Sequence, residues 1–327
     1  ELFGAHKLLQ DIKKLENNSI KVVPGPCMGR CNVAPTVCVG KNYVDVANFD
    51  KVKKTIDEKT FDPFIPDYIN LSSYKKNGGY EIANKIKNGV ISKKQVLDSL
   101  NESGLKGKGG AGFPTGKKWE IVSNYNGKKY VAVNGDEGEP GTFKDRSYLE
   151  SDPHRFLEGA LIASYFINAQ KVYIYMRDEY PTVIKILLDE INKMEDEEII
   201  PKDFFIVRRG AGAYICGEES AMIESIEGKR GLPRHRPPYV AEIGLFGCPT
   251  LTNNLETLFW VRDIIEKGAK WFAEKGSNGN KGFHSFSVSG RVKNPGVKVA
   301  PAGITIQQLI DEYCDGMADG HTFKGYL

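Results

Sequence analysis

Short apolar runs alternate with longer amphipathic stretches between residues 130 and 210, and this alternation restricts the possible folds more than any other feature. The runs YVAVN, KVYIYM and FFIVRRG are rich in β-branched and aromatic residues and have the length of strands. The stretches HRFLEGALIASYFI and TVIKILLDEINKM, which separate them, have the length of helices. Strands that alternate with helices predict an α/β fold, in which helices cover both faces of a mainly parallel sheet.

Three further segments differ from this central one. Residues 1–58 predict a small α/β unit, with a helix in LFGAHKLLQDIKKL, strands in IKVVPG, TVCVG and YVDVA, and a helix from NFDKVKKTI. Residues 59–103 are polar and are interrupted by prolines and glycines, so we expect a linker with one or two helices. Residues 276–327 predict two strands joined through a Pro-Gly turn and followed by a helix. The central domain is thus expected over residues 104–275.

Composition excludes several classes of protein. With 40% hydrophobic and 27% charged residues, the 327-residue chain can bury a core and is not disordered. A net charge of +3 gives no support for a nucleic-acid partner. No apolar run approaches the roughly 18 to 20 residues that span a bilayer, so we expect no membrane insertion and a cytoplasmic location. Since the sequence opens on Glu1 without Met, we expect a fragment of a longer protein.

The stretch GLKGKGGAGFPTGKKWE, residues 104–120, combines six glycines with lysines and suggests a phosphate-binding loop. Gly107, Gly109 and Gly112 satisfy G-x-G-x-x-G, but the residues before them predict a polar helix, whereas the dinucleotide fingerprint follows a strand. The Walker pattern fails too, because Lys118 occupies the place of the hydroxyl residue. An ATP-binding module is therefore a weak alternative, and the glycines alone also fit a simple tight loop.

Polar residues gather where three other elements end or begin. NGDEGEPGTFKDR follows the first strand, RRGAGAYICGEES follows the third, and CPTLTNNLETL places two asparagines where a helix should begin. Ligands of α/β sheets bind at strand ends, and helix N-termini attract anions. Each group alone also has an ordinary structural explanation, as a solvated helix start or an N-cap.

Taken together, these segments resemble the flavoprotein subunit that accepts electrons from NADH in respiratory complex I, NAD-linked hydrogenases and NAD-dependent formate dehydrogenases. The shared motifs are G-x-G-G-A-G-F-P-T-G-x-K-W, N-x-D-E-x-E-P-G-x-F-K-D-R, G-A-G-A-Y-I-C-G-E-E and P-T-x-x-N-N-x-E-T, within residues 90–327. The resemblance implies a Rossmann-like domain that binds FMN and NADH, followed by the start of a ubiquitin-like β-grasp (SLBB) domain. A non-catalytic scaffold that retained the fold is disfavoured by the intact polar groups.

The resemblance also assigns residues to the two cofactors. FMN would be bound by Gly107, Gly109, Lys118, Asn134, Asp136, Glu137, Tyr214, Gly217, Glu218, Asn253, Asn254 and Thr257, with Lys118 as the charge partner of the phosphate. NADH would be bound by Phe113, Glu139, Glu219, Arg236 and Tyr239. Acidic groups near a ribose favour NAD over NADP. No catalytic acid or base is expected, because hydride passes directly between the two cofactors.

The loop PGPCMGRCNVAP pairs Cys27 with Cys31 and supplies half of the four ligands that a [2Fe–2S] cluster needs. From the residues alone, free thiols and a structural role remain open. The loop and the strands after it resemble the second half of a thioredoxin-like [2Fe–2S] ferredoxin. In that fold the first cysteine pair precedes the first helix, which we expect to begin at about Leu2. The missing pair would then lie before Glu1, and the family's [4Fe–4S] cysteines would lie beyond Leu327.

The fusion of a ferredoxin-like unit with the flavin domain favours the β subunit of an NAD-dependent formate dehydrogenase. The same module in an NAD(P)-linked hydrogenase or in NADH:quinone oxidoreductase is the alternative. The expected partners are NADH or NAD⁺, a molybdenum formate dehydrogenase α subunit or a hydrogenase subunit, and a small ferredoxin-like subunit.

Overall fold

A four-stranded parallel sheet forms the centre of the computed structural model, which describes residues 3–326. Its strands follow the order β5–β4–β3–β6, and their bounds are β3 (Tyr130–Gly135), β4 (Lys171–Met176), β5 (Phe205–Arg209) and β6 (Thr250–Asn254). The three strands predicted from the alternating pattern are confirmed. The fourth strand, β6, was not expected, because its sequence TLTNN is polar at its carboxyl end.

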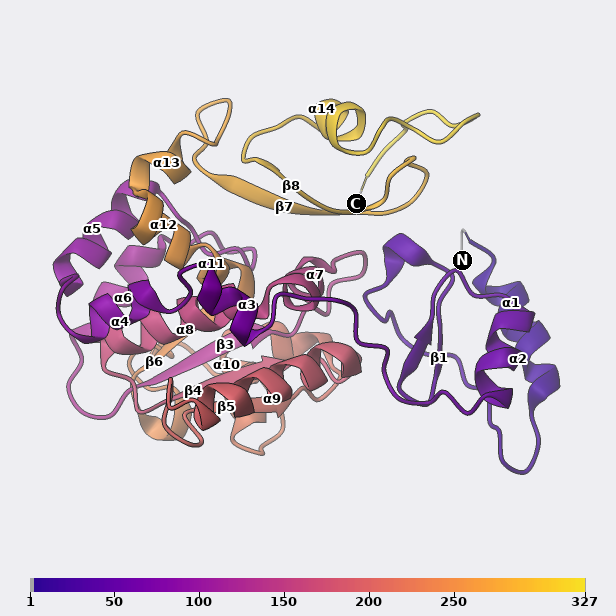
Figure 1. Cartoon of the computed structure of the whole chain (residues 1–327), viewed down its shortest axis with the longest axis horizontal. Helices are drawn as coiled ribbons and strands as arrows, with labels where there is room; N and C mark the ends of the chain where they lie inside the picture. Colours follow the sequence, from indigo (N-terminus) through magenta and orange to yellow (C-terminus); the bar gives the residue numbers. More distant parts are fainter. Residues whose placement is uncertain (1–2, 327) are drawn as a thin grey trace.

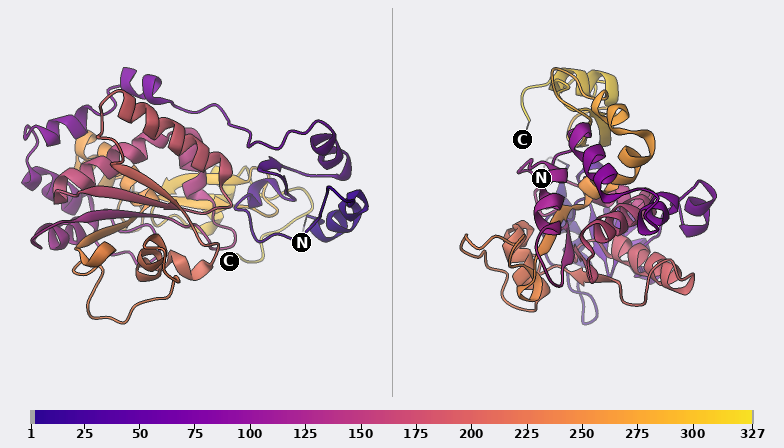
Figure 2. Two further views of the ribbon diagram at one scale, coloured as in Figure 1. Left: turned by 90° about the horizontal axis from the view of Figure 1, so that it is seen from below. Right: turned by 90° about the vertical axis from the view of Figure 1, so that its left-hand side faces the viewer.

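Helices cover both faces of this sheet, as predicted (Figures 1 and 2). On one face, Val131 and Val133 of β3 belong to the large core that also contains α8 (Pro153–Ile167) and α9 (Pro181–Asp196). On the other face, Ala132 packs in a smaller core with α10 (Glu219–Ile226). The chain passes from β3 through β4 to edge strand β5, and then returns across the second face to β6. The strand order therefore reverses between β3 and β6.

Residues 59–103, expected to be a linker, instead contribute three helices to the main core. Their bounds are α3 (Leu71–Lys76), α4 (Glu81–Lys87) and α5 (Lys93–Ser103). Leu71, Val96 and Leu100 are buried in the same core as α8. The segment looked like a linker because each helix is short and buries only a narrow stripe among lysines and asparagines.

More short helices complete this layer and lead to the site. They are α6 (Thr115–Ser123), α7 (Lys144–Ser151), α11 (Leu255–Phe259), α12 (Val261–Lys267) and α13 (Ala269–Ala273). Within the described residues, no helix is long and apolar enough to cross a membrane.

The N-terminal unit is small and lies beside the main body, drawn in indigo at the right of Figure 1. It contains α1 (Ala5–Ile12), the antiparallel pair β1 (Val37–Val39) and β2 (Asn42–Val44), and α2 (Phe49–Asp57). Leu2, where the first helix was expected to begin, lies outside the described residues. The strand predicted at IKVVPG is wrong: it forms only an isolated bridge at Ile20, and its two-proline neighbourhood offers few N–H donors for a ladder.

The C-terminal segment forms the predicted hairpin, which runs along the top of the molecule in Figure 1. Strands β7 (Phe283–Val288) and β8 (Gly296–Pro301) pair antiparallel, and α14 (Ile306–Gln308) follows and continues as a π-helical turn. The hairpin is fixed to the main body, since Lys108 Nζ donates to the carbonyl of Phe283 (2.6 Å) and the Phe143 N–H donates to Ser287 Oγ (2.9 Å).

Candidate functional site

The carboxyl ends of β3 and β6 define the candidate site. Asn134 and Asn254 are register partners at these ends, and Asn254 Nδ2 donates to the Asn134 carbonyl (3.4 Å). Because the strand order reverses between β3 and β6, this is the topological switch point at which open α/β sheets bind ligands.

The glycine-rich loop lies over the end of β6. It starts after Gly104, which ends α5 in the left-handed conformation, and is closed by a hydrogen bond from the Gly107 N–H to the Phe113 carbonyl (2.9 Å). A Cβ at Gly109 would lie 3.2 Å from the Asn254 Cβ, so the backbone approaches β6 closely there. A Cβ at Gly110 or Gly112 would meet no atom within 4 Å. The loop is therefore packed on one side and open on the other, as a phosphate cradle should be.

Helix α6 contacts both β6 and the start of α10 through two adjacent side chains. Lys118 Nζ donates to the Thr252 carbonyl (3.1 Å) and lies 3.6 Å from Glu219 Oε2. The neighbouring Trp119 is fully buried and donates its Nε1–H to Asn253 Oδ1 (2.9 Å). The Lys118 ammonium group therefore lies at the edge of the site. The side-chain oxygen of Asn253, in contrast, already accepts a hydrogen bond from Trp119 inside the protein.

The loop after β3 is tied to the loop before α10. Asn134 Nδ2 donates to the Gly217 carbonyl (2.7 Å), and Asn134 Oδ1 accepts the Asp136 N–H (3.0 Å). The Tyr214 hydroxyl donates a hydrogen bond to Glu139, which adds a second contact between the same two loops. Two segments about 80 residues apart in the sequence therefore form one wall of the site.

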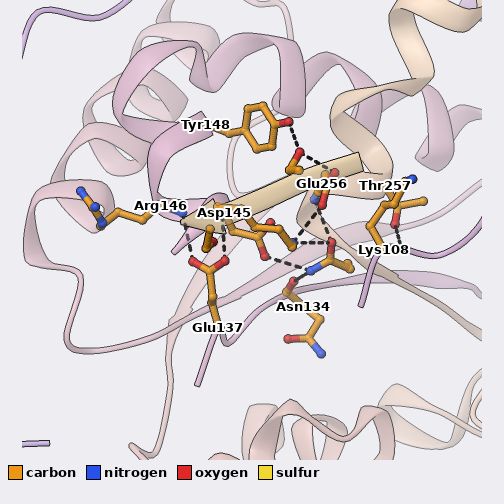
Figure 3. A network of polar contacts seen from close by, with 12 residues as sticks. Lys108, Asn134, Glu137, Asp145, Arg146, Tyr148, Glu256 and Thr257 are labelled. Carbon is orange, nitrogen blue, oxygen red and sulfur yellow. Dashed lines mark hydrogen bonds and ion pairs between the residues drawn. The ribbon is translucent and has the colours of Figure 1, made fainter. Parts of the chain in front are cut away.

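Glu137 points away from this wall and into the protein. Its carboxylate accepts the N–H groups of Asp145 (2.9 Å) and Arg146 (3.3 Å) at the start of α7 (Figure 3). It also accepts a hydrogen bond from the Tyr180 hydroxyl (3.1 Å). Burial and the nearby Asp145 raise the pKa of Glu137 to about 7. The side chain organises the helix that frames the site, and its predicted contact with FMN stays a prediction.

Asp136 is the predicted residue with an unused acceptor. Its Oδ2 is buried and has no hydrogen-bond partner in the described part of the chain. Burial raises the pKa of Asp136 to about 6. A buried acceptor without a partner costs free energy, so its presence directly after β3 fits a ligand that brings hydroxyl or N–H donors.

Of the residues predicted for NADH, the structure brings Arg236 and Glu219 together at the start of α10. Arg236 pairs with Glu218 and lies 3.2 Å from Glu219 Oε1, which brings the basic loop against the start of α10. Glu218 also caps α10 by accepting the N–H groups of Ser220 and Ala221. Three predicted aromatic side chains are exposed: Phe113 (41%) in the glycine loop, Tyr214 (68%) beside Glu139, and Tyr239 (58%) before Val240, whose carbonyl accepts the Thr250 N–H at the amino end of β6. Exposed aromatic rings next to a polar site suit the stacking of a flat ligand.

The profile of one protein family, described as "Nuo51 FMN-binding domain", matches residues 100–263, half of the chain. The chain belongs to this family. The site described above, from the glycine loop to β6, lies within the matched residues, and the resemblance drawn from the four motifs is confirmed.

Relatives of the Nuo51-type chain agree with this assignment. An NADH-quinone oxidoreductase subunit of Rhizobium meliloti, of the type designated F, is 42% identical over 272 residues, which are 80% of this chain and 64% of the relative. The F-type NADH-quinone oxidoreductase subunit of Aquifex aeolicus is 44% identical over 259 residues, 77% of this chain and 60% of the relative. The chain thus spans about three fifths of the length of these curated relatives.

A solved structure resembles nearly the whole Nuo51-type chain. It is the crystal structure of NAD⁺-reducing [NiFe]-hydrogenase in the air-oxidised state, with a TM-score of 0.80 and 28% sequence identity. The match covers 96% of this chain and 58% of that chain, so it includes most of the N-terminal unit and the hairpin as well as the sheet.

A group of buried charges beneath the Nuo51-type site was not predicted (Figure 3). Lys144 Nζ lies 2.7 Å from Asp145 Oδ1 and 3.2 Å from Glu256 Oε2, and Asp145 accepts from Asn254 Nδ2 (2.9 Å). Ser285 of the C-terminal hairpin donates to Glu256 (2.7 Å). The two carboxylates raise the pKa of Lys144 although burial opposes this. The available signal was the charge of FKDR and NNLET at the starts of α7 and α11.

Thr257, predicted to contact FMN, is used to fix the glycine loop. Its Oγ1 accepts the Lys108 N–H (2.9 Å), and the residue is fully buried. Gly217 has more room, since an added Cβ would have the Asp136 carbonyl at 3.5 Å as its nearest neighbour.

The cysteine pair is assembled as two ligands of one metal ion would be. The Sγ atoms of Cys27 and Cys31 are 3.7 Å apart, close to the edge of about 3.8 Å that follows from tetrahedral bonds of about 2.3 Å. The hydrogen bond from Cys31 lowers the pKa of Cys27 to about 5, with help from backbone groups of Gly29 and Gly141 and against the effect of burial. In the described residues no third cysteine, histidine or carboxylate completes a metal site. The pair therefore fits half of a cluster site.

Replacing Asp136 with asparagine is expected to stabilise the flavin-free protein and weaken flavin binding. Between the ordinary pKa of 3.8 and the folded value of about 6, the folded state binds more protons than the unfolded state, so stability falls as the pH rises through this window. At 1.36 kcal/mol per pKa unit, and allowing for partial exposure, Asp136→Asn should raise the unfolding free energy by about 1 to 2 kcal/mol at pH 8. Urea unfolding at pH 4 and pH 8 and titration with FMN test this. Equal stability of the two proteins at pH 8 would contradict it.

Proposed function

We propose that this chain binds FMN at the switch point between β3 and β6, and NADH at the rim beside it, and transfers hydride between the two. The observation that carries the proposal is the unpartnered buried Oδ2 of Asp136, which directly follows β3 at the switch point. Bound FMN would supply the chemistry, since it takes two electrons together as hydride and releases them singly. Membership of the Nuo51 family and the names of its relatives support this reading.

The protein's own residues would bind and orient FMN and NADH, and would not exchange protons with the reacting atoms. The glycine loop would let the backbone approach the FMN phosphate, and Lys118 would balance its charge. Asp136 and Asn134 would accept and donate hydrogen bonds at the ribityl and ring groups. Phe113 and Tyr239 would stack on NADH. Glu139 and Glu219 would accept hydrogen bonds from its ribose hydroxyls and would disfavour a 2′-phosphate. Much of the rate would then come from proximity.

For the whole protein, we propose the β subunit of a cytoplasmic NAD-dependent formate dehydrogenase, with a thioredoxin-like [2Fe–2S] ferredoxin before the flavin domain and a β-grasp domain after it. The adjacent half-site Cys27 and Cys31 supports the ferredoxin assignment, and the hairpin β7–β8 supports the β-grasp assignment. A NAD-linked hydrogenase is the second candidate, because the hydrogenase structure matches 96% of this chain. The full-length protein, purified with its partners, decides between them: molybdenum with formate-dependent NAD⁺ reduction indicates the first, and nickel indicates the second.

The test of the core proposal is the cofactor itself. The full-length protein should carry a flavin spectrum that NADH bleaches, and should reduce ferricyanide with NADH. A colourless protein that takes up no FMN on reconstitution would exclude the proposal.

Lys118→Ala is expected to weaken FMN retention about tenfold without unfolding the protein, because a partly exposed charge on a phosphate is worth about 1 to 2 kcal/mol. The matched control is Lys117→Ala, since Lys117 is the exposed neighbour on the same helix. The flavin-to-protein ratio after gel filtration and the FMN dissociation constant measure the effect. Glu218→Ala should act in the same direction, because the side chain caps α10 and holds Arg236 at the site. Equal losses in Lys118→Ala and Lys117→Ala would contradict a phosphate contact.

A further inference from the structure

Two buried arginines of the flavin-type domain hold the cysteine loop. Arg177, which follows β4 and is 5% exposed, donates from Nη2 to the Cys27 carbonyl (2.7 Å). Arg146, on α7 and 6% exposed, donates from Nε to the Gly29 carbonyl (3.0 Å). Buried guanidinium groups that satisfy carbonyls of a distant loop are costly to desolvate, so they indicate a contact of defined geometry.

Arg177 also reaches the loop that follows β3 in the candidate flavin site. Arg177 Nη1 donates to the Glu137 carbonyl (2.9 Å), so one guanidinium bridges Cys27 and the residue after Asp136. The backbone of Gly141, in the loop after β3, lies near both thiols and favours their deprotonated form. The cysteine pair is thus connected to the flavin-site loop by a single side chain and by one direct backbone contact.

The shape of the contact is as specific as its hydrogen bonds. Gly29 has a φ of 63°, and a Cβ at this position would lie 2.2 Å from the Tyr180 hydroxyl oxygen. Only glycine fits between the cysteine loop and Tyr180, whose hydroxyl donates to Glu137. The docking surface is therefore continuous from Gly29 through Tyr180 to Glu137.

The charges around this contact set its electrostatic effect. Arg177 Nε lies 3.5 Å from Glu179 Oε2, and its charge also acts on the Asp136 carboxyl; Arg146 Nη1 lies 2.5 Å from Glu150 Oε2. Arg30 also contacts Glu150, at 3.5 Å. A reduced [2Fe–2S] cluster carries one more negative charge than the oxidised one, so a buried cation beside its ligand loop favours the reduced form. Removal of Arg177 would also leave the Glu179 carboxylate without its nearest cation.

We propose that Arg177 and Arg146 are positioning residues that lock the cysteine loop onto the flavin-type domain and raise the reduction potential of the cluster held there. The inference rests on the proposed function in one respect, namely that Cys27 and Cys31 hold two of the four ligand positions of a [2Fe–2S] cluster in the complete protein.

The test is a redox titration of the [2Fe–2S] signal by electron paramagnetic resonance in the full-length protein. In Arg177→Gln we expect at least a tenfold shift of the equilibrium toward the oxidised cluster, which is about 59 mV for a one-electron couple. Arg177→Lys keeps the charge and should shift it less. The double variant Arg177→Gln/Glu179→Gln removes both charges and should recover part of the shift. The control is Arg209→Gln, since Arg209 pairs with Asp178 at the surface.

The outcomes separate this inference from the proposed function. A wild-type protein without flavin or cluster counts against the proposed function. A wild-type protein with both, whose potential is unchanged in Arg177→Gln, overturns the inference. Loss of the cluster in Arg177→Gln with flavin retained supports the locking role. Loss of cluster, flavin and fold together, in Arg177→Lys as well as in Arg177→Gln, overturns it, because the residue would then serve general stability alone.

Discussion

Gly109→Val is expected to weaken FMN binding at least a hundredfold and to leave the fold intact. Gly109 lies where the loop crosses the end of β6, and a Cβ there would be 3.2 Å from the Asn254 Cβ. That distance is too short for a branched side chain without movement of Asn254, which joins Asn134, Asp145 and the start of α11. Either the loop lifts from β6 or the valine methyl groups enter the space proposed for the phosphate, and both remove the backbone donors from the ligand.

The matched control for this change is Gly89→Val. Gly89 lies at the surface after α4, and no atom lies within 4 Å of a Cβ built there. Its φ of 73° means that valine adds backbone strain at this position, so Gly89→Val should lower stability while FMN affinity is kept. Titration of flavin-free protein with FMN, followed by quenching of flavin fluorescence, measures affinity, and circular dichroism measures folding. Wild-type affinity in Gly109→Val would show that the loop does not approach the phosphate.

The sheet could be predicted because its central strands β3 and β4 are almost completely buried and long helices separate the predicted strands. A run such as KVYIYM is typical of a strand that is covered on both faces, and the structure buries five of its six residues. Strand β6 escaped prediction for the opposite reason: its residues TLTNN serve the site, and their polarity hides the strand. The helices of residues 71–103 were underestimated because their burial depends on α8, a partner far away in the sequence.

The candidate site was predictable as a set of segments, though not as a set of contacts. The glycine loop, the loop after β3 and the asparagines of β6 do converge, because parallel strands end at one edge of the sheet. What each side chain does there depends on neighbours that the sequence order does not reveal. Asp136 and Glu137 are adjacent and chemically alike, yet one has an unpartnered oxygen while the other caps α7. The bridge from Arg177 to Cys27 spans 150 residues and leaves no local pattern.

Glu190→Ala is expected to destabilise the protein by about 3 to 5 kcal/mol, the usual cost of breaking a buried, fully paired carboxylate. The Glu190 side chain is completely buried in α9, and both of its oxygens are used. Oε1 accepts from the Tyr68 hydroxyl and from Lys193 Nζ, and Oε2 accepts the Leu71 N–H and lies 2.7 Å from His154 Nε2. The residue therefore anchors the segment that connects the cysteine unit to the sheet, and its loss should release that segment first.

The pH dependence of the stability of Glu190→Gln separates the contribution of the Glu190 charge from that of its packing. Burial alone would raise the pKa of Glu190, but its hydrogen bonds outweigh burial and lower the pKa to about 2. A lowered folded pKa stabilises the protein above the ordinary value of 4.5, by about 3 kcal/mol, and this stabilisation is lost as the pH falls toward 2. The difference in unfolding free energy between the wild type and Glu190→Gln should therefore shrink from pH 6 to pH 3. The control is Glu197→Gln, which removes an exposed ion pair with Lys75 and should cost less than about 1 kcal/mol at every pH in this range. Urea unfolding across this range, combined with amide hydrogen exchange of residues 68–83, measures both effects. A difference that does not change with pH would show that Glu190 acts by packing alone, because an ionised anchor must lose its advantage once the carboxylate is protonated.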